Sequence, residues 1–298
     1  MKNLMYLALS FFIVACSDKK ELGEKNRFSE KDLAYFEAIK ANDEALPEPL
    51  YGQWRYHHHE QKQSFDDYIS ERPFSPNSEQ SVIYLQPLGE FTSLQMKAIG
   101  LTRDYLEIFF QRKTVVLPPV SDAYIPPNAR RENSGHEQLL TGHILKKMLL
   151  PAVPDDAMAL MAISEKDLYP DEDWNYVFGQ ASYKDRIGVS SVYRLQDEYL
   201  SQSNFKLCLR RLINVSSHEI GHMLSVKHCQ FAKCVMNGSN NMDETDVSPN
   251  RLCSDCQKKF TWNLGYDNTK RLEMLVAFTQ SNGLDTALLA KDLNSFPN

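Results

Sequence analysis

The chain has 298 residues, of which 42% are hydrophobic and 24% charged, and its formal net charge is −6. This composition is typical of a globular protein with a core of ordinary size, and the length allows one large domain or two small ones. Acidic and basic residues are well mixed, which argues against a nucleic-acid-binding surface. No nucleic acid is therefore expected as a partner.

Residues 1–16 have the pattern of a processing segment that lies outside the fold. Lys2 precedes an apolar run that ends at Ala15, and this run is too short for a transmembrane helix, which needs about 20 residues. The run leads into Cys16, as in the lipobox of bacterial lipoproteins, so Cys16 is the predicted lipidation site. We therefore expect a lipoprotein anchored to a membrane of the bacterial cell envelope, periplasmic or surface-facing. A plain secretory signal or an uncleaved anchor is the alternative.

Residues 17–50 are charge-mixed and poor in large apolar side chains, which predicts a tether with one short helix. Ser29 can cap a helix over residues 29–41, with Asp32 at its third position. The apolar residues of this helix recur at helical spacing, namely Leu33, Phe36 and Ile39. Disorder of the whole segment is the alternative, and residues 51–298 form the predicted folded domain.

From residue 81 onward, strands and helices alternate. The predicted strands cover residues 82–85, 114–117, 157–163, 175–181 and 187–193, and the predicted helices cover residues 92–110 and 137–150. His136 and His143 are expected on the polar face of the second helix. The neighbouring His57, His58 and His59 predict a solvated turn, because adjacent side chains diverge. The expected fold class is α+β, with an α/β-like N-terminal part and a twisted mixed sheet on which helices pack.

The longest predicted helix covers residues 204–226. One apolar stripe recurs along it at three- and four-residue steps, formed by Leu209, Leu212, Ile213, Ile220 and Leu224. His218 and His222 lie off this stripe, on a face that can look into a cleft. Two more helices are predicted over residues 268–279 and 285–293.

The motif His218-Glu219-Ile220-Gly221-His222 predicts a metal site on this helix. Histidines four residues apart share one face, so both can reach a single Zn²⁺ while Glu219 acts as general base. His228 can complete a set of three imidazoles with an open position for water. Such a site is catalytic in type, because structural zinc usually has four protein ligands.

Two close cysteine pairs follow, with Met236 between them. Cys229 and Cys234 form the first pair, and Cys253 and Cys256 form the second. This spacing predicts a four-thiolate structural site, which brings the expected cofactors to two Zn²⁺ ions. An oxidising compartment would favour disulfides instead. The pairs Cys229–Cys234 and Cys253–Cys256, or the cross-pairs, remain the alternative.

The stretches HEIGHMLSVKHCQFAKCVM and CSDC resemble the archaemetzincins, a branch of the metzincin zinc peptidases, and so do DLYPDEDWNYVFGQAS and GVSSVYR upstream. The resemblance extends from about Tyr51 to about Gly283. It implies a metzincin-type fold with a zinc-binding active-site helix and a C-terminal subdomain stabilised by cysteine-bound zinc. Residues 51–298 would then be the catalytic domain.

The resemblance also implies roles for individual residues. The catalytic-zinc ligands would be His218, His222 and His228; the base would be Glu219; Met236 would form the turn beneath the zinc; and Cys229, Cys234, Cys253 and Cys256 would hold the structural zinc. The strand over residues 175–181 would be an antiparallel edge on which Phe178, Gly179 and Gln180 bind substrate backbone. A plain core or edge strand is the alternative.

One departure from the family pattern lies at Ser225, where metzincins normally have a glycine. Either Ser225 accepts a left-handed conformation, helped by its hydroxyl group, or the turn uses an ordinary negative φ. Asn237 and Gly238 follow Met236, so the tyrosine that ligates zinc in some metzincins is not offered here.

The expected function is that of a zinc metallopeptidase, a hydrolase that cleaves peptide bonds through a zinc-activated water with Glu219 as general base. Its partners would be a peptide or protein substrate and, through the lipid anchor, a membrane. The alternative is a non-catalytic, zinc-stabilised peptide-binding lipoprotein in which Ser225 has spoiled the turn to His228.

Overall fold

The computed structural model describes residues 28–296, and the predicted signal segment with Cys16 lies outside these residues. The main sheet has five strands, which are β1 (Val82–Leu88), β2 (Thr114–Val116), β5 (Ala157–Ser164), β7 (Gly179–Ala181) and β8 (Ile187–Ser191). Their order is β2-β1-β5-β8-β7. Neighbouring strands are parallel except at the edge, where β7 runs antiparallel to β8. The predicted mixed sheet is confirmed.

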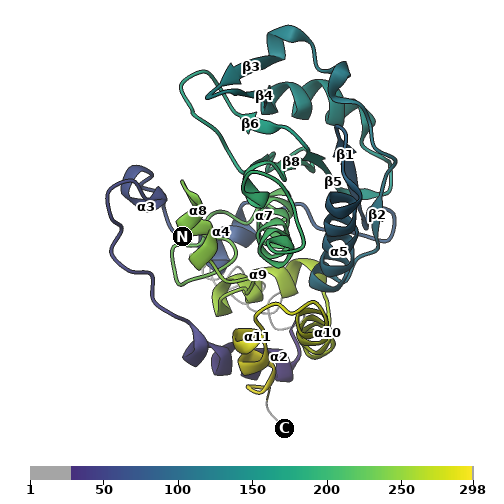
Figure 1. Ribbon diagram of the computed structural model, residues 1–298. Coiled ribbons are helices and arrows are strands. Elements are labelled where there is room, and N and C mark those ends of the chain that lie inside the picture. Colours follow the sequence, from purple (N-terminus) through teal and green to yellow (C-terminus); the bar gives the residue numbers. More distant parts are fainter. Residues whose placement is uncertain (1–27, 297–298) are drawn as a thin grey trace, which may run out of the picture.

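The central strand β5 is buried along its whole length, as expected for a parallel strand covered on both faces. Met161 and Ile163 belong to the larger hydrophobic cluster, which includes α5 (Ser93–Phe110) and α7 (Phe205–Met223). Leu160 and Ala162 point the other way, into a second cluster. Figure 1 shows α5 and α7 side by side against the sheet.

A smaller sheet lies at the upper end of Figure 1. It consists of β3 (Arg130–Asn133), β4 (His136–Leu140) and β6 (Asp167–Tyr169). β4 pairs antiparallel with β3 and parallel with β6. β3 and β6 are short, with four and three residues, and neither strand was predicted from the sequence.

The prediction of a helix over residues 137–150 is wrong for the first residues of that range, which belong to β4. Helical turns follow only from there on, as α6 (Thr141–His143), the π-helical η4 (Ile144–Leu149) and the 3₁₀ turn η5 (Leu150–Ala152). Tertiary contacts override helix propensity here, because His136 and Gln138 bond to the buried carboxylate of Asp167 at 2.9 and 2.7 Å. His136 is therefore not on a helix face.

The remaining α-helices are short or C-terminal. They are α2 (Glu30–Ile39), α3 (Trp54–His57), α4 (Phe65–Ser70), α8 (Met242–Val247), α9 (Ser254–Leu264), α10 (Asn268–Ser281) and α11 (Ala287–Leu293), with 3₁₀ turns η1 (Lys40–Asn42), η2 (Asp122–Tyr124), η3 (Pro127–Ala129) and η6 (Arg194–Gln196). The sequence predicted α2, α10 and α11 but not α9. Within residues 28–296, no helix has both the length and the apolar character required to cross a membrane.

Helix α2 has the predicted capping box between Ser29 and Asp32. Its residues Tyr35, Phe36 and Ile39 are buried in the larger hydrophobic cluster, and the helix lies at the lower end of Figure 1, where it contacts α9. The described part of the expected tether is therefore part of the folded body.

Candidate metal centre

Helix α7 presents two of the predicted ligands on one face. The apolar stripe on another face is buried as expected at Leu209, Leu212, Ile213 and Ile220. His218 and His222 lie one turn apart, and their Nε2 atoms are 2.9 Å from each other. Their Nδ1–H groups donate to the carbonyl oxygens of Val235 at 2.8 Å and Val226 at 2.7 Å.

Helix α7 ends in a Schellman motif. The N–H of Ser225 donates to the carbonyl of His222 at 2.8 Å, and the N–H of Val226 donates to the carbonyl of Gly221 at 3.1 Å. Ser225 has a φ of +66°, so the first of the two alternatives, a left-handed serine, is the one found. This conformation costs roughly 1–2 kcal/mol for a residue with a Cβ. The Ser225 hydroxyl donates to the Tyr183 carbonyl at 3.3 Å.

The turn brings His228 to the other two histidines. One ligand atom of each residue lies within 4.8 Å of those of the other two. The Nδ1–H of His228 donates to both oxygens of the Glu60 carboxylate, at 2.8 and 2.9 Å. In all three rings Nδ1 faces an acceptor, so a neutral ring carries its proton there and presents Nε2 as a free lone pair.

This donor set fits zinc. Three imidazole lone pairs that converge on one place are typical of catalytic zinc sites. With Nδ1 protonated in both rings, the Nε2 atoms of His218 and His222 face each other as two lone pairs, which a bound cation would stabilise. Burial and the neighbouring His228 lower the pKa of His218 to about 3, and burial lowers that of His222 well below its ordinary value. Both rings are therefore neutral, the form that binds a metal.

The carboxylate of Glu219 lies between α7 and the edge strand β7. Burial raises its pKa to about 8, and a zinc ion bound beside it would lower that pKa again, because a nearby cation favours the ionised form that a general base needs. An ideal Cβ at Gly179 would lie 2.5 Å from Glu219 Oε1, so the strand can approach the carboxylate this closely only because residue 179 is glycine. The backbone of β7 at Gly179 is therefore in close contact with the Glu219 carboxylate.

The floor beneath the histidines contains Met236, which is fully buried. An ideal Cβ at Gly221 would lie 2.5 Å from Met236 Sδ, so the glycine of the HEIGH motif admits the methionine under the helix. The chain around Met236 also carries the Val235 carbonyl that orients His218. Met236 is therefore packed against α7 next to the histidine site.

A cleft of about 550 Å³ opens over the three imidazoles and Glu219. The predicted substrate-binding residues Phe178, Gly179 and Gln180 all line it. The edge strand begins only at Gly179 and is shorter than the predicted strand over residues 175–181, but it is antiparallel and at the sheet edge as expected. Aromatic side chains form much of the remaining wall, namely Trp54, Trp174, Tyr176 and Tyr183.

The four predicted cysteines form one buried cluster, with every sulfur within 4.8 Å of the others. Cys229 Sγ and Cys253 Sγ are 3.5 Å apart, and the N–H of Cys253 donates to Cys234 Sγ at 3.3 Å. None of the five cysteines within residues 28–296 is in a disulfide. A single group of four thiols fits a tetrahedral zinc site rather than two separate disulfides. The protein thus has donor sets for two zinc ions.

The cysteine cluster fixes the loop that carries His228 and Met236. The N–H of Cys229 donates to the carbonyl of Met236 at 2.7 Å. The Asn237 side chain accepts from the N–H of Cys234 at 2.7 Å and donates to the carbonyl of Cys229 at 2.8 Å. A zinc ion held by the four cysteines would therefore stabilise the loop next to the histidine site.

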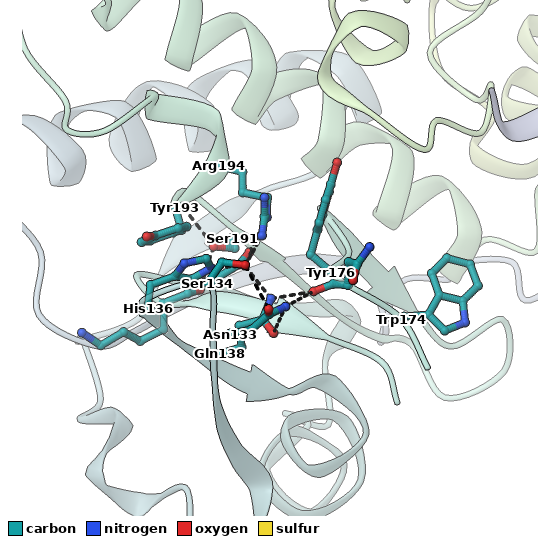
Figure 2. Close-up of polar contacts among 12 residues, drawn as sticks. Asn133, Ser134, His136, Gln138, Trp174, Tyr176, Ser191, Tyr193 and Arg194 are labelled. Atoms are coloured by element: carbon teal, nitrogen blue, oxygen red, sulfur yellow. Dashed lines mark hydrogen bonds and ion pairs between the residues drawn. The ribbon is translucent and has the colours of Figure 1, made fainter. Parts of the chain in front are cut away.

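A polar cluster around the buried Asp167 lies next to the cleft, and it was not predicted from the sequence. Figure 2 shows His136, Gln138 and Arg194 close together near Tyr176, and both Tyr176 and Trp174 line the cleft. Arg194 pairs with the buried Asp167 at 2.7 Å, and its guanidinium lies 3.6 Å from the centroid of the Tyr176 ring. This cluster connects the small sheet to an aromatic residue of the cleft.

Glu60 is a further residue near the site that was not predicted from the sequence. It follows the three histidines at 57–59, and neither metal group found among the described residues contains any of those histidines. His58 instead stacks on Trp54, with ring centroids 3.9 Å apart. No local pattern marks Glu60, because its partner His228 is 168 positions away.

The chain is similar to known zinc peptidases. A family model described as Peptidase family M54 matches residues 135–261, which contain all three histidines, Glu219, Met236 and the four cysteines. The chain is 32% identical over 255 residues to archaemetzincin-2 of Rattus norvegicus, across 75% of this chain and 71% of that protein. It is 29% identical over 184 residues to the archaemetzincin of Thermococcus kodakarensis, across 61% and 97%. The crystal structure of an archaemetzincin from Methanopyrus kandleri has the same fold, with a TM-score of 0.53 and 23% identity, and the match covers 65% of this chain and 100% of that one.

Proposed function

Because this chain belongs to the archaemetzincin family, peptidase family M54, we propose that its zinc metallopeptidase chemistry takes place at His218, His222 and His228 with Glu219 as the general base. The observation that carries the proposal is the convergence of three Nε2 lone pairs beside a carboxylate that lines the same cleft. Peptides are the substrates that the family implies.

A zinc ion bound by the three imidazoles supplies a Lewis acid that polarises the substrate carbonyl and lowers the pKa of water. The chain supplies the proton transfer. Glu219 accepts the proton that the attacking water loses and returns it to the leaving amine. The three Nδ1–H hydrogen bonds hold the imidazoles in the tautomer that leaves Nε2 free.

The edge strand would hold the substrate. An extended peptide can add to the free edge of β7, so Phe178, Gly179 and Gln180 would pair with its backbone next to Glu219. Met236 shapes the floor of the site, and the four cysteines would hold the structural zinc. The alternative of a non-catalytic peptide-binding protein rested on a spoiled turn at Ser225. That turn is intact, which favours the peptidase.

Cleavage of a fluorogenic peptide library by the zinc-loaded chain tests this function. We expect cleavage that a chelator stops and that added zinc restores. A chain that contains both zinc ions and cleaves no member of the library would contradict the proposal.

We also propose that Cys16 is lipidated and anchors the enzyme in the bacterial cell envelope. The support is the apolar run that leads into this cysteine. A lipid anchor is effective because each buried methylene contributes about 0.8 kcal/mol. Cys16→Ala should move the protein from the detergent phase to the soluble fraction or leave it unprocessed. Wild-type protein found in the cytosol would contradict this location.

A further inference from the structure

His228 is held differently from the other two histidines. Backbone carbonyls accept the Nδ1–H groups of His218 and His222, whereas His228 donates to a side-chain carboxylate, that of Glu60. Glu60 also accepts from Gln230 Nε2 at 3.3 Å and from Trp54 Nε1 at 3.4 Å. Two further donors thus fix the carboxylate that orients His228.

The same N-terminal segment also holds the backbone of the turn before His228. The Gln63 side chain, itself buried, donates to the carbonyl of Ser225 at 3.1 Å and accepts from the N–H of Lys227 at 3.0 Å. The buried Tyr68 donates from its hydroxyl to the carbonyl of Leu224 at 2.9 Å. Side chains from outside α7 therefore bond to the backbone of the turn at three residues, namely Leu224, Ser225 and Lys227.

These contacts come from a part of the chain that the family model does not match, because its match begins at residue 135. The bonds within the Schellman motif end at Val226, and the next backbone bond of the loop is that of Cys229 to Met236, so His228 lies between two fixed points. We propose that Glu60, Gln63 and Tyr68, here called the N-terminal clamp, position His228 as the third zinc ligand. Glu60 is thus a positioning residue that sets the zinc affinity of the histidine site.

The physical reason is the carboxylate behind the imidazole. A ligating histidine that donates its other N–H to a carboxylate is fixed in one tautomer and one ring orientation, and its metal-binding nitrogen becomes more basic. Loss of such a partner typically weakens metal binding by about 10–100-fold. This inference rests on the ligand assignment of the proposed function, but not on peptide cleavage.

Zinc affinity of the full-length chain is the test. The histidine site is titrated against a chelator too weak to empty the cysteine site. We expect Glu60→Ala to weaken zinc binding there by about 10–100-fold, and Glu60→Gln to weaken it less, because an amide oxygen still accepts but carries no charge. Glu44→Gln is the matched control, since Glu44 forms an exposed ion pair with Lys233 at 2.8 Å and should leave zinc affinity unchanged.

A double mutant separates positioning from a general loss of structure. In a His228→Ala background, Glu60→Ala should cause no further loss of zinc affinity, and the cysteine-bound zinc should remain in every variant. Unchanged affinity in Glu60→Ala, or an equal loss without His228, would overturn the inference. If the wild-type chain binds zinc but cleaves no peptide, the proposed function fails while the role of Glu60 stands.

Discussion

The backbone of Gly179 lies directly against the Glu219 carboxylate. An ideal Cβ at position 179 would be 2.5 Å from Oε1 and 2.8 Å from Cδ of Glu219. No side chain fits at these distances without movement of the strand or the carboxylate. The edge strand would hold the substrate, and Glu219 is the proposed base. Each of the two therefore fixes the position of the other.

Gly179→Ala should therefore reduce peptide cleavage strongly while both zinc ions stay bound. A displacement of about 1 Å at a reacting group can cost about 10²-fold in rate, and we expect a loss of kcat/KM of that order. The control is Gly100→Ala on α5, where an added Cβ meets nothing within 4 Å. Full activity in Gly179→Ala would show that the close contact does not matter.

The left-handed Ser225 predicts a stabilising substitution. Ser225→Gly removes the Cβ from a residue with φ +66° and should raise the melting temperature of the zinc-loaded protein, with a gain of up to about 1 kcal/mol. Cleavage should be equal or better. Ser225→Ala serves as control, because it keeps the Cβ and loses only the hydroxyl bond to Tyr183. A lower melting temperature for Ser225→Gly would refute the argument from strain.

The cysteine cluster predicts the metal content. Elemental analysis should find two zinc ions in the wild-type chain and one in Cys253→Ser, whose unfolding free energy should fall by several kcal/mol because structural zinc contributes directly to folding. Cys208→Ala, at a buried cysteine outside the cluster, should keep both ions. One zinc ion in the wild type, with a mass four hydrogens lower, would favour disulfides instead.

Much of this site could be predicted from the sequence, because its ligand spacing is local. His218 and His222 follow the helical period, and the cysteines come as close pairs. Glu60 could not be found in this way, because its contact with His228 depends on how distant segments pack. The strand β4, in place of the predicted helix, has a related cause. Gln138 favours a helix by propensity, but its bond to Asp167 holds it in a strand. For Ser225 the sequence left two backbone conformations open, and the structure shows the one with positive φ.

The ion pairs of Asp246 with Arg210 and Arg211 predict how the free energy of unfolding depends on pH. Burial would raise the pKa of this carboxyl, but hydrogen bonds and charge from Arg211 and Arg210 lower it below its ordinary value. A lowered folded-state pKa stabilises the protein above the unfolded pKa of about 3.9, and this stability is lost as the pH falls through the folded value. Asp246→Asn should therefore lower the unfolding free energy at pH 7, and its difference from wild type should shrink below about pH 4.

Denaturant unfolding at several pH values measures this difference. Glu198→Gln, at an exposed carboxylate, is the control and should show little change. A difference between wild type and Asp246→Asn that stays constant down to low pH would contradict the role of the ion pair.

The most direct test of the proposed mechanism is a paired measurement on Glu219→Ala. Because Glu219 is assigned as a base and not as a ligand, this variant should contain two zinc ions, melt close to the wild-type temperature and cleave no peptide. Retained cleavage would contradict the mechanism. Loss of one zinc ion together with activity would make Glu219 a ligand and would contradict the assignment of the three histidines as the complete donor set.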